Sequence, residues 1–500
     1  MRKYLWISGL CCLIACVALA GRAQQQERDR PARPNVLFIF VDDLRPQLGA
    51  YGHEEMHTPN IDRLTAQGVR FTRQFVQVPT CGASRYSLLT GQRPSGPGDL
   101  SNEVFRRMRQ IPQEGPESMV ELFRRSGYRT VGIGKVSHYP DGRVYGYDRP
   151  TSETMEMPNS WDEMFLPYGK WEHGWEAFFA YADGTGRTQR LNSNRPAPPF
   201  EAGDVPDEGY PDGLIAQAAV EKLGGFKGRD EPFFLAVGFF KPHMPFNAPQ
   251  KYWDLYPEDE ADLSPAPGAP ENVHAGPALH NSAEAARYTH PENWRADQEH
   301  HRQMRRAYRA AVSYVDAQIG QVLDALEAEG LADDTIVVLW GDHGFHLGDT
   351  TIWGKHTLFD WALHSPLIVR VPGTAHAGSA ADGIVEALDI YPTLADLCGL
   401  DAPPTLAGAS LRPMLENPQA SGREAAFSYW SNGAVSMRTD RYRLTRYRPP
   451  VEDGYIYELY DLAADPHETR NIAPDQPELV RQLATGMEQA IEKHLRADKP

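Results

Sequence analysis

The chain has 500 residues, of which 41% are hydrophobic, and it contains 10 Trp, 22 Tyr and 19 Phe. This size and composition exclude an intrinsically disordered chain and predict two or three units with large packed cores. With 67 acidic against 50 basic residues, the formal net charge of −17 argues against a partner that is nucleic acid or an anionic membrane. An anionic substrate would need a local cluster of cations or a metal ion.

The N-terminal segment is predicted to be an export signal and not part of the fold. Basic residues precede an apolar run from Tyr4 to Ala20, which is shorter than a membrane-spanning helix needs. We expect a signal peptide over residues 1–23, a periplasmic or secreted protein, and no transmembrane segment. Two alternatives stay open, namely an uncleaved anchor and a lipoprotein attached at Cys16.

Strands and helices are predicted to alternate along the next part of the chain. Strands are expected at 35–41, 130–133, 233–238, 335–340 and 367–371. Helices are expected at 58–67, 116–125, 300–329 and 389–397. This alternation favours an α/β fold in which a mostly parallel sheet is sandwiched by helices.

Two segments, 140–212 and 242–298, are rich in Pro, Gly, Trp, Tyr and acidic residues and lack sustained periodicity. Segments of this kind inside a compact domain are usually functional rims or lids. A domain boundary is predicted between a catalytic domain, 34–402, and a smaller C-terminal α+β unit, 403–500. That unit is expected to contain an antiparallel sheet and a closing amphipathic helix.

Polar side chains follow two of the predicted strands. Asp42 and Asp43 come directly after 35–41, and Asp342 with His343 follows the strand at 335–340. Ligands of open α/β sheets bind outside the carboxyl ends of the strands, so we expect these pairs to converge. Carboxylate and imidazole ligands suit a hard divalent cation such as calcium. The alternative for either pair alone is an ordinary turn or helix cap.

Cysteine usage supplies a second signal. Beyond the export signal only Cys81 and Cys398 remain, which excludes a disulfide framework and leaves one bridge between them as an alternative. Cys81 begins the pattern C-x-A-S-R, which ends at Arg85 and is followed by L-T-G. This pattern resembles the signature of the sulfatases, in which a formylglycine-generating maturation enzyme oxidises the cysteine to formylglycine (3-oxoalanine). Ala83 stands where that family more often has proline.

The resemblance extends along most of the chain and is similar to the iduronate-2-sulfatase branch of the family. The motifs that carry it are VDDLRP at 41–46, TPNID at 58–62, GKVSH at 134–138, KPHMPF at 241–246, GDHG at 341–344 and ELYDL at 458–462. It implies an alkaline-phosphatase-like α/β domain with a smaller C-terminal antiparallel-sheet domain.

The resemblance also implies the site. Calcium would be held by Asp42, Asp43, Cys81, Asp342 and His343, and the catalytic residues would be Cys81, Arg85, Lys135, His138, His243 and Lys355. The hydrated aldehyde offers two hydroxyls, of which one attacks sulfur and the other allows the intermediate to collapse and release sulfate. Arg85 would stabilise this group, and a helix starting at Ser84 would direct its amides at the anion. The general acid would be His243 or Lys355.

The implied substrate is a sulfated oligosaccharide of glycosaminoglycan or algal type. We expect exo-acting removal of a ring sulfate, with O2 of a uronic acid at the non-reducing end as the first candidate. Two alternatives stay open. One is a phosphomonoester or phosphonate hydrolase of the alkaline phosphatase superfamily, and the other is a catalytically dead, carbohydrate-binding relative.

Overall fold

The computed structural model describes residues 33–109, 115–148, 151–448 and 454–497. The predicted export signal and Cys16 lie outside these residues. Within the described part of the chain, no helix has both the length and the apolar character needed to cross a bilayer.

A large mixed sheet forms the centre of the molecule. Its strands, in spatial order, are β13 (Ser379–Ala381), β2 (Val69–Phe71), β12 (Leu367–Arg370), β9 (Thr335–Gly341), β1 (Asn35–Val41), β7 (Phe233–Phe239), β4 (Arg129–Gly134) and β5 (Glu163–Phe165). Neighbouring strands run parallel except at β12, which is antiparallel to both β2 and β9. The prediction of a mostly parallel sheet is therefore confirmed.

The central position of β1 in the sheet explains why its sequence is apolar throughout. β1 pairs with β7 on one side and with β9 on the other, and residues 36–41 are completely buried. A strand that is paired on both edges and covered on both faces has no solvent side, so its sequence does not alternate. The bounds of β1 agree with the prediction at both ends.

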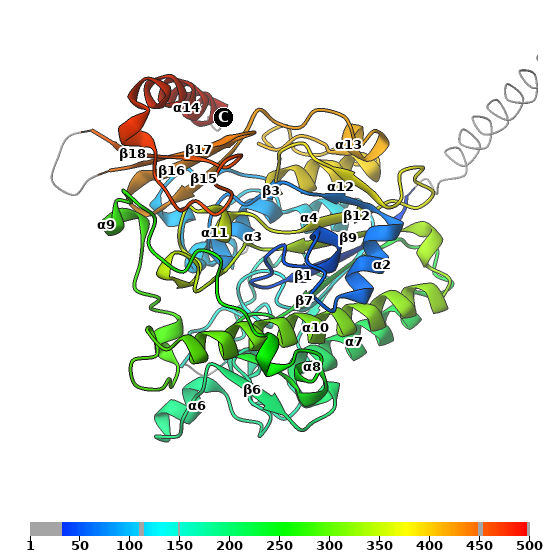
Figure 1. Ribbon diagram of the computed structural model, residues 1–500. Coiled ribbons are helices and arrows are strands. Elements are labelled where there is room, and N and C mark those ends of the chain that lie inside the picture. Colours follow the sequence, from blue (N-terminus) through cyan, green and yellow to red (C-terminus); the bar gives the residue numbers. More distant parts are fainter. Residues whose placement is uncertain (1–32, 110–114, 149–150, 449–453, 498–500) are drawn as a thin grey trace, which may run out of the picture.

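Helices cover both faces of the sheet (Figure 1). One layer consists of α2 (Pro59–Gln67), α7 (Pro211–Phe226) and the long α10 (Gln298–Ala328), which packs against the other two. The opposite layer contains α3 (Cys81–Thr90), α4 (Met119–Arg125) and α12 (Ile390–Leu397). Because Ser118 accepts a hydrogen bond from the backbone of Glu121 as the N-cap, α4 begins at Met119 and is shorter than predicted.

The two segments without periodicity contain short elements. The first holds β5, α5 (Gly174–Phe178), α6 (Arg187–Asn192) and β6 (Phe200–Gly203), and the second holds β8 (Phe246–Pro249), α8 (Gln250–Trp253) and α9 (Ala275–Ala278). β6 pairs with β8, which ties the two segments together. Smaller elements elsewhere are β3 (Gln74–Phe75), β10 (His346–Leu347), β11 (Trp353–Gly354), β14 (Val385–Glu386), α11 (Asp360–Leu363) and α13 (Arg412–Glu416).

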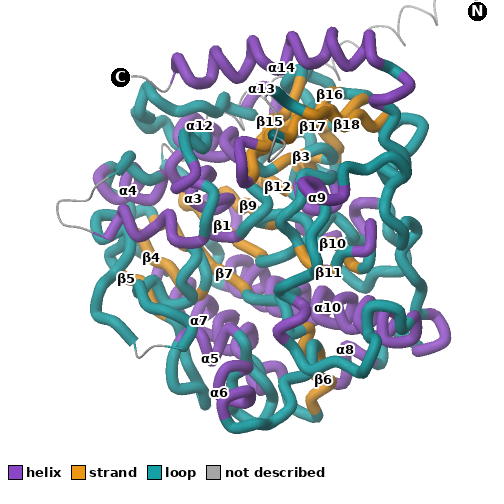
Figure 2. The backbone as a smooth tube through the Cα atoms, turned by 90° about the vertical axis from the view of Figure 1, so that its left-hand side faces the viewer, coloured by secondary structure: helices purple, strands orange, loops and turns teal. Residues whose placement is uncertain are grey.

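The C-terminal part forms the predicted antiparallel sheet. Its strands are β15 (Ala425–Trp430), β16 (Ala434–Thr439), β17 (Tyr442–Tyr447) and β18 (Ile456–Asp461), and α14 (Pro477–Ala497) lies across them (Figure 2). A small separate core, which includes Leu444, Leu459 and Met487, joins helix and sheet. The domain boundary at 402 remains a prediction.

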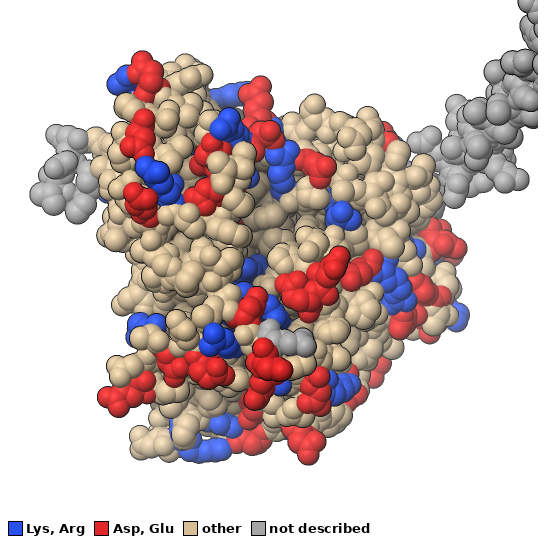
Figure 3. All heavy atoms as spheres, in the orientation of Figure 1, with Lys and Arg blue, Asp and Glu red and all other residues tan. Residues whose placement is uncertain are grey.

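The two cysteines of the described chain are both free and buried, so they do not form the bridge that was left open. On the face drawn in Figure 3, acidic and basic side chains are interspersed and do not gather into a stripe of one sign.

Candidate active site

Polar residues follow four neighbouring parallel strands and meet at one edge of the sheet. The residues are Asp342 and His343 after β9, Asp42 and Asp43 after β1, Lys241 and His243 after β7, and Lys135 and His138 after β4. Carboxyl ends of adjacent parallel strands lie side by side, which brings together residues that are far apart in sequence. The structure thus unites the two acidic pairs, as expected from their positions after strands.

Cys81 is the first residue of α3, and the predicted helix start at Ser84 is wrong. Thr80 is extended, and its carbonyl already accepts the backbone N–H of Ser84 at 2.9 Å, so the first helical turn spans Cys81. The side chain of Asn102 accepts the backbone N–H of Gly82 at 2.8 Å. Cys81 therefore lies at the positive end of the helix dipole, where an anion is stabilised.

The ligand atoms of four buried residues, Asp42, Cys81, Asp342 and His343, all lie within 4.8 Å of one another. Nδ1 of His343 donates to the carbonyl of Gly344 at 2.9 Å, which leaves the lone pair of Nε2 free and 3.3 Å from Sγ of Cys81. Asp43 is adjacent, and its Oδ2 is buried without a hydrogen-bond partner among the described residues. This donor set fits a divalent cation.

Cations surround these carboxylates. Arg85 donates to Oδ2 of Asp342 at 2.8 Å and to Oδ1 of Asp42 at 3.3 Å, and Lys135 bonds the second oxygen of Asp42. Burial pushes the pKa of Asp42 upward, but Lys135 and other nearby cations hold it well below its ordinary value. The group is therefore an anion at neutral pH.

Asp43 has the opposite electrostatic environment. Nζ of Lys355 lies 2.7 Å from its Oδ1, yet burial raises the pKa of Asp43 to about 7, and the charge of Asp42 adds to the rise. A buried carboxylate that resists ionisation gains from a nearby positive charge. A cation bound next to Asp43 would therefore favour the ionised form of this carboxylate.

The thiol of Cys81 is a poor nucleophile in this position. Burial raises its pKa well above the ordinary value, and the charge of Asp42 adds to that rise. Thiolate, not thiol, is the reactive form of cysteine. A catalytic role for this side chain therefore calls for chemistry other than that of a free thiol.

His243 makes hydrogen bonds through both ring nitrogens. Nδ1 lies 2.6 Å from the carbonyl oxygen of Met244, and Nε2 lies 3.0 Å from Oε1 of Glu284. Both partners are acceptors and therefore favour a proton on each nitrogen, but burial and the charge of Lys355 outweigh Glu284 and lower the pKa of His243 to about 4. The second oxygen of Glu284 lies 3.4 Å from Nζ of Lys355.

Glu284 is a site residue that the sequence analysis missed. It lies in the segment 242–298, which was expected to be a rim, but a single Glu in an acid-rich stretch without periodicity carries no distinguishing signal. By contrast Lys241, which belongs to a recognised motif, holds its own loop by donating to the carbonyls of His243 and Pro245 at 3.0 and 2.7 Å.

His138 lies beside the cluster and contacts aromatic residues. Its Nε2 lies 3.4 Å from the hydroxyl of Tyr147, and its ring packs against Trp175 at 5.2 Å. Burial and the charge of Lys135 lower its pKa well below the ordinary value, so the ring is neutral.

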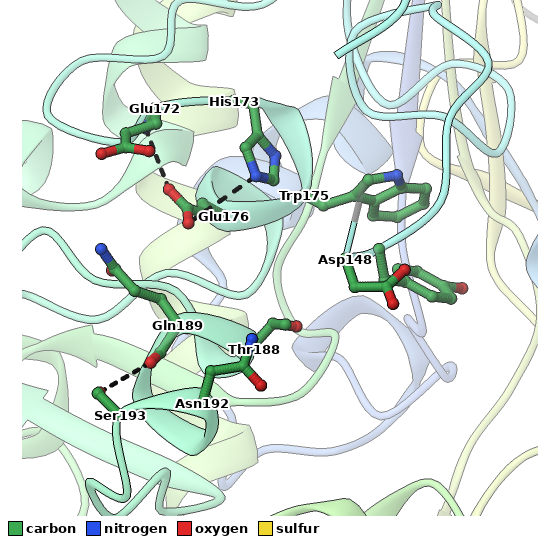
Figure 4. A pocket seen from close by; sticks show the side chains of 10 residues that line it. Asp148, Glu172, His173, Trp175, Glu176, Thr188, Gln189, Asn192 and Ser193 are labelled. Atoms are coloured by element: carbon green, nitrogen blue, oxygen red, sulfur yellow. Dashed lines mark hydrogen bonds and ion pairs between the residues drawn. The ribbon is translucent and has the colours of Figure 1, made fainter. Parts of the chain in front are cut away.

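Tyr147 and Trp175 also line a hollow of about 520 Å³ next to the cluster (Figure 4). Its other lining side chains are polar, namely Asp148, Glu172, His173, Glu176, Thr188, Gln189, Asn192 and Ser193. Figure 4 shows Gln189 and Asn192 on one side of the hollow, opposite Glu172 and His173. These polar side chains could form hydrogen bonds with the part of a ligand that extends from the cluster into the hollow.

Comparison with known families decides the assignment. A family model described as Sulfatase matches residues 34–400, which is most of the chain. The chain belongs to the sulfatase family. A second model, described as N-sulphoglucosamine sulphohydrolase, C-terminal, matches residues 348–496. The sulfatase is therefore a sulfuric ester hydrolase with an alkaline-phosphatase-like fold.

Individual relatives match most of the chain. A protein named Sulfatase from Formosa agariphila is 32% identical over 94% of this chain and 88% of its own length. Iduronate 2-sulfatase from Homo sapiens is 33% identical over 81% of this chain and 75% of its own. Among solved structures, a phosphonate monoester hydrolase of Agrobacterium radiobacter is 26% identical with a TM-score of 0.71, covering 93% of this chain and 96% of its own.

Proposed function

We propose that this sulfatase hydrolyses a sulfate ester on a carbohydrate, with Cys81 converted to formylglycine and calcium bound beside it. The observation that carries the proposal is the position of Cys81, whose Sγ lies 3.3 Å from Nε2 of His343 inside a cluster of buried carboxylates. A protonated thiol is unreactive at this position. The hydroxyl of a formylglycine hydrate would instead be a nucleophile whose negative charge the helix N-terminus stabilises.

The modified residue would supply a hydrated aldehyde with two hydroxyls on one carbon, one to attack sulfur and one to release sulfate. Arg85, one turn along the same helix, would hold this group and the carboxylates of Asp42 and Asp342 in fixed positions. Its three charge-assisted contacts with those groups and the backbone of Lys135 support a rigid placement.

Asp42, Asp43, Asp342 and His343 would hold the cation, together with the side chain at position 81. Three carboxylates are hard oxygen donors, which favours calcium over a softer transition metal. The ion would neutralise a sulfate oxygen and lower the cost of charge that develops in the transition state.

Lys135 and Lys355 would bind the remaining sulfate oxygens, and His243 would donate a proton to the leaving alkoxide. The two acceptors around His243 support its assignment as the general acid, because they favour the imidazolium. His138 is neutral and buried among aromatic rings, which supports a role in positioning Tyr147 and the adjacent hollow.

For the substrate, we propose an exo-acting removal of the O2 sulfate from a uronic acid at the non-reducing end of a sulfated oligosaccharide. The similarity to iduronate 2-sulfatase and the polar hollow beside the cluster support a short chain with one sugar at the nucleophile. The net charge of −17 would disfavour a long polyanion. Export to the periplasm or medium and a formylglycine-generating partner belong to the same proposal.

One alternative has an observation in its favour. The likeness to a phosphonate monoester hydrolase, at a TM-score of 0.71, keeps phosphonate or phosphomonoester hydrolysis as the second candidate. A dead relative has less support, because both Cys81 and Arg85 are present.

The test offers defined 2-O-sulfated uronate oligosaccharides beside 6-O-sulfated hexosamines, intact polymers, an aryl sulfate and an aryl phosphonate. Protein matured by a formylglycine-generating enzyme is expected to turn over the uronate sulfates fastest. Faster turnover of polymers or hexosamine sulfates would overturn the substrate proposal, and faster phosphonate hydrolysis would overturn the sulfatase activity.

A further inference from the structure

Arg187, the first residue of α6, is a buried cation without a carboxylate partner. Its guanidinium carbon lies 3.7 Å from the ring centroid of Phe179 and 5.1 Å from that of Tyr288, and NH1 donates to the Tyr288 hydroxyl at 3.3 Å. Within the described chain, no carboxylate oxygen forms an ion pair with it, although the residue is only 5% exposed. A desolvated charge without an anion is costly and calls for a reason.

The position of Arg187 relates it to the active site. α5 ends at Phe178 and Phe179 follows it as the C-cap residue, and a cationic side chain lies over each of the two rings. Phe178 lies under Nζ of Lys135 at 4.3 Å, and Phe179 lies under Arg187. Both rings also face the imidazole of His243, at 4.5 and 6.0 Å. The same structural unit therefore positions a sulfate-binding lysine and the unpaired arginine.

The hydroxyl of Tyr147 interacts electrostatically with the charges of both Lys355 and Arg187. Its hydroxyl is 3.4 Å from Nε2 of His138, and its ring packs against Phe179 at 5.7 Å. Burial raises the pKa of Tyr147 to about 12, and the charges of Lys355 and Arg187 oppose that rise. Arg187 thus acts electrostatically on a group that borders the site.

We propose that Arg187 binds a second anionic group on the sugar whose sulfate is removed, with the carboxylate of a uronic acid as its ligand. This inference rests on the proposed function. A guanidinium stacked on aromatic rings is held flat and presents its free N–H groups in one plane, as bidentate recognition of a carboxylate requires. Arg187 is 5% exposed and His243 is 4% exposed. The burial of Arg187 is therefore no greater than that of a residue at the proposed reaction centre. A second sulfate would satisfy the same chemistry.

Arg190, one turn along α6, is a matched comparison. It also stacks on an aromatic ring, with its guanidinium carbon 3.9 Å from the centroid of Tyr181. Unlike Arg187, it has anionic partners, Asp183 at 3.1 Å and Glu201 at 3.8 Å. Stacking alone is therefore compatible with a paired structural arginine, and the missing partner is what distinguishes Arg187.

The experiment compares kcat and KM of Arg187→Gln, Arg187→Lys and Arg190→Gln on four substrates. These are a 2-O-sulfated uronate disaccharide, its carboxyl-reduced counterpart, a counterpart with a second sulfate in place of the carboxylate, and a small aryl sulfate. Arg187→Gln is expected to lower kcat/KM about 10- to 100-fold, mainly through KM, on substrates with a second anion. The other two substrates should change less than about threefold, and Arg187→Lys should be intermediate.

The pattern of loss decides the proposal. Loss on the uronate alone would identify the carboxylate, and loss on the disulfated sugar alone would identify a sulfate. An equal loss on all four substrates, or the same pattern for Arg190→Gln, would overturn the inference. If Arg187→Gln does not fold, inhibition of the wild-type enzyme by the unsulfated uronate must exceed that by its carboxyl-reduced form, and equal inhibition would overturn the inference. A wild-type enzyme that releases no sulfate at all would instead overturn the proposed function.

Discussion

Nε2 of His243 donates a hydrogen bond to Oε1 of Glu284 at 3.0 Å, while Nδ1 faces the carbonyl oxygen of Met244. Burial and the nearby charge of Lys355 lower the pKa of His243 to about 4, and Glu284 opposes both without cancelling them. Since the two hydrogen-bond partners are acceptors, Glu284 favours the imidazolium. Glu284, a residue from a segment without periodicity, therefore keeps the pKa of the proposed general acid higher than burial and Lys355 alone would leave it.

Replacement of Glu284 by Gln should shift the alkaline limb of the pH–rate profile to lower pH. Loss of the carboxylate charge destabilises the imidazolium, so His243 loses its proton earlier as the pH rises, by about one pH unit. The pH dependence of kcat measures this. Glu258→Gln is the control, since Glu258 lies in the same segment but pairs with Arg306 at the surface. An unchanged limb would contradict the role of Glu284.

If His243 protonates the leaving alkoxide, His243→Asn should lower the hydrolysis rate most for the substrates with the most basic leaving groups. We expect a loss of about 100-fold or more on alkyl sulfates, and a much smaller loss on an aryl sulfate whose leaving group is already acidic. Rates across a series of leaving groups check this. Equal losses across the series would point away from His243, and a steeper dependence for Lys355→Gln would assign the proton to Lys355.

Asp342→Ala should remove roughly 3 kcal/mol or more of transition-state stabilisation, because it deletes a proposed metal ligand that also fixes Arg85. Activity after chelation should return with calcium in the wild-type enzyme and should not return in the variant. Asp316→Asn is the control, because Asp316 is a buried carboxylate of α10 that bonds Asn60 away from the site. A chelated wild-type enzyme with its full rate would refute the metal assignment.

A second buried ion pair predicts sensitivity to acid. Asp349 is 2.8 Å from Arg45, and although burial opposes it, this cation and Arg305 lower the pKa of Asp349 from 3.8 to about 2. The depressed pKa contributes about 2 kcal/mol of stability above pH 4, which is lost as the pH falls towards 2. Urea unfolding of wild type and Asp349→Asn should differ near neutral pH and converge in acid. A difference that does not depend on pH would contradict this.

The sequence predicted the core of the fold better than its rims. The run 35–41 is apolar throughout and bounded by polar residues, so its strand was located at both ends. The apolar run at 367–371 gave a strand but not its direction, because such a run is equally apolar in either orientation, and β12 proved antiparallel.

The residues of the candidate site were likewise predictable where they follow core strands and unpredictable where they lie in segments without periodicity. Asp42 and Asp342 were found because they follow buried strands, whose carboxyl ends must meet. Glu284 and Arg187 lie in segments without periodicity, and nothing local to their sequence tells where such a segment returns in space. Only the folded chain brings Glu284 to His243 and leaves Arg187 without an anion.

The most direct test of the central claim is the mass of the peptide that contains Cys81, measured together with sulfate release. Matured, active enzyme should contain this peptide about 18 Da lighter than the unmodified thiol form, as thiol-to-aldehyde conversion requires, and activity should rise with the converted fraction. Protein expressed without a maturation system should retain the thiol and show little activity. Full activity with an unmodified Cys81 would contradict the account.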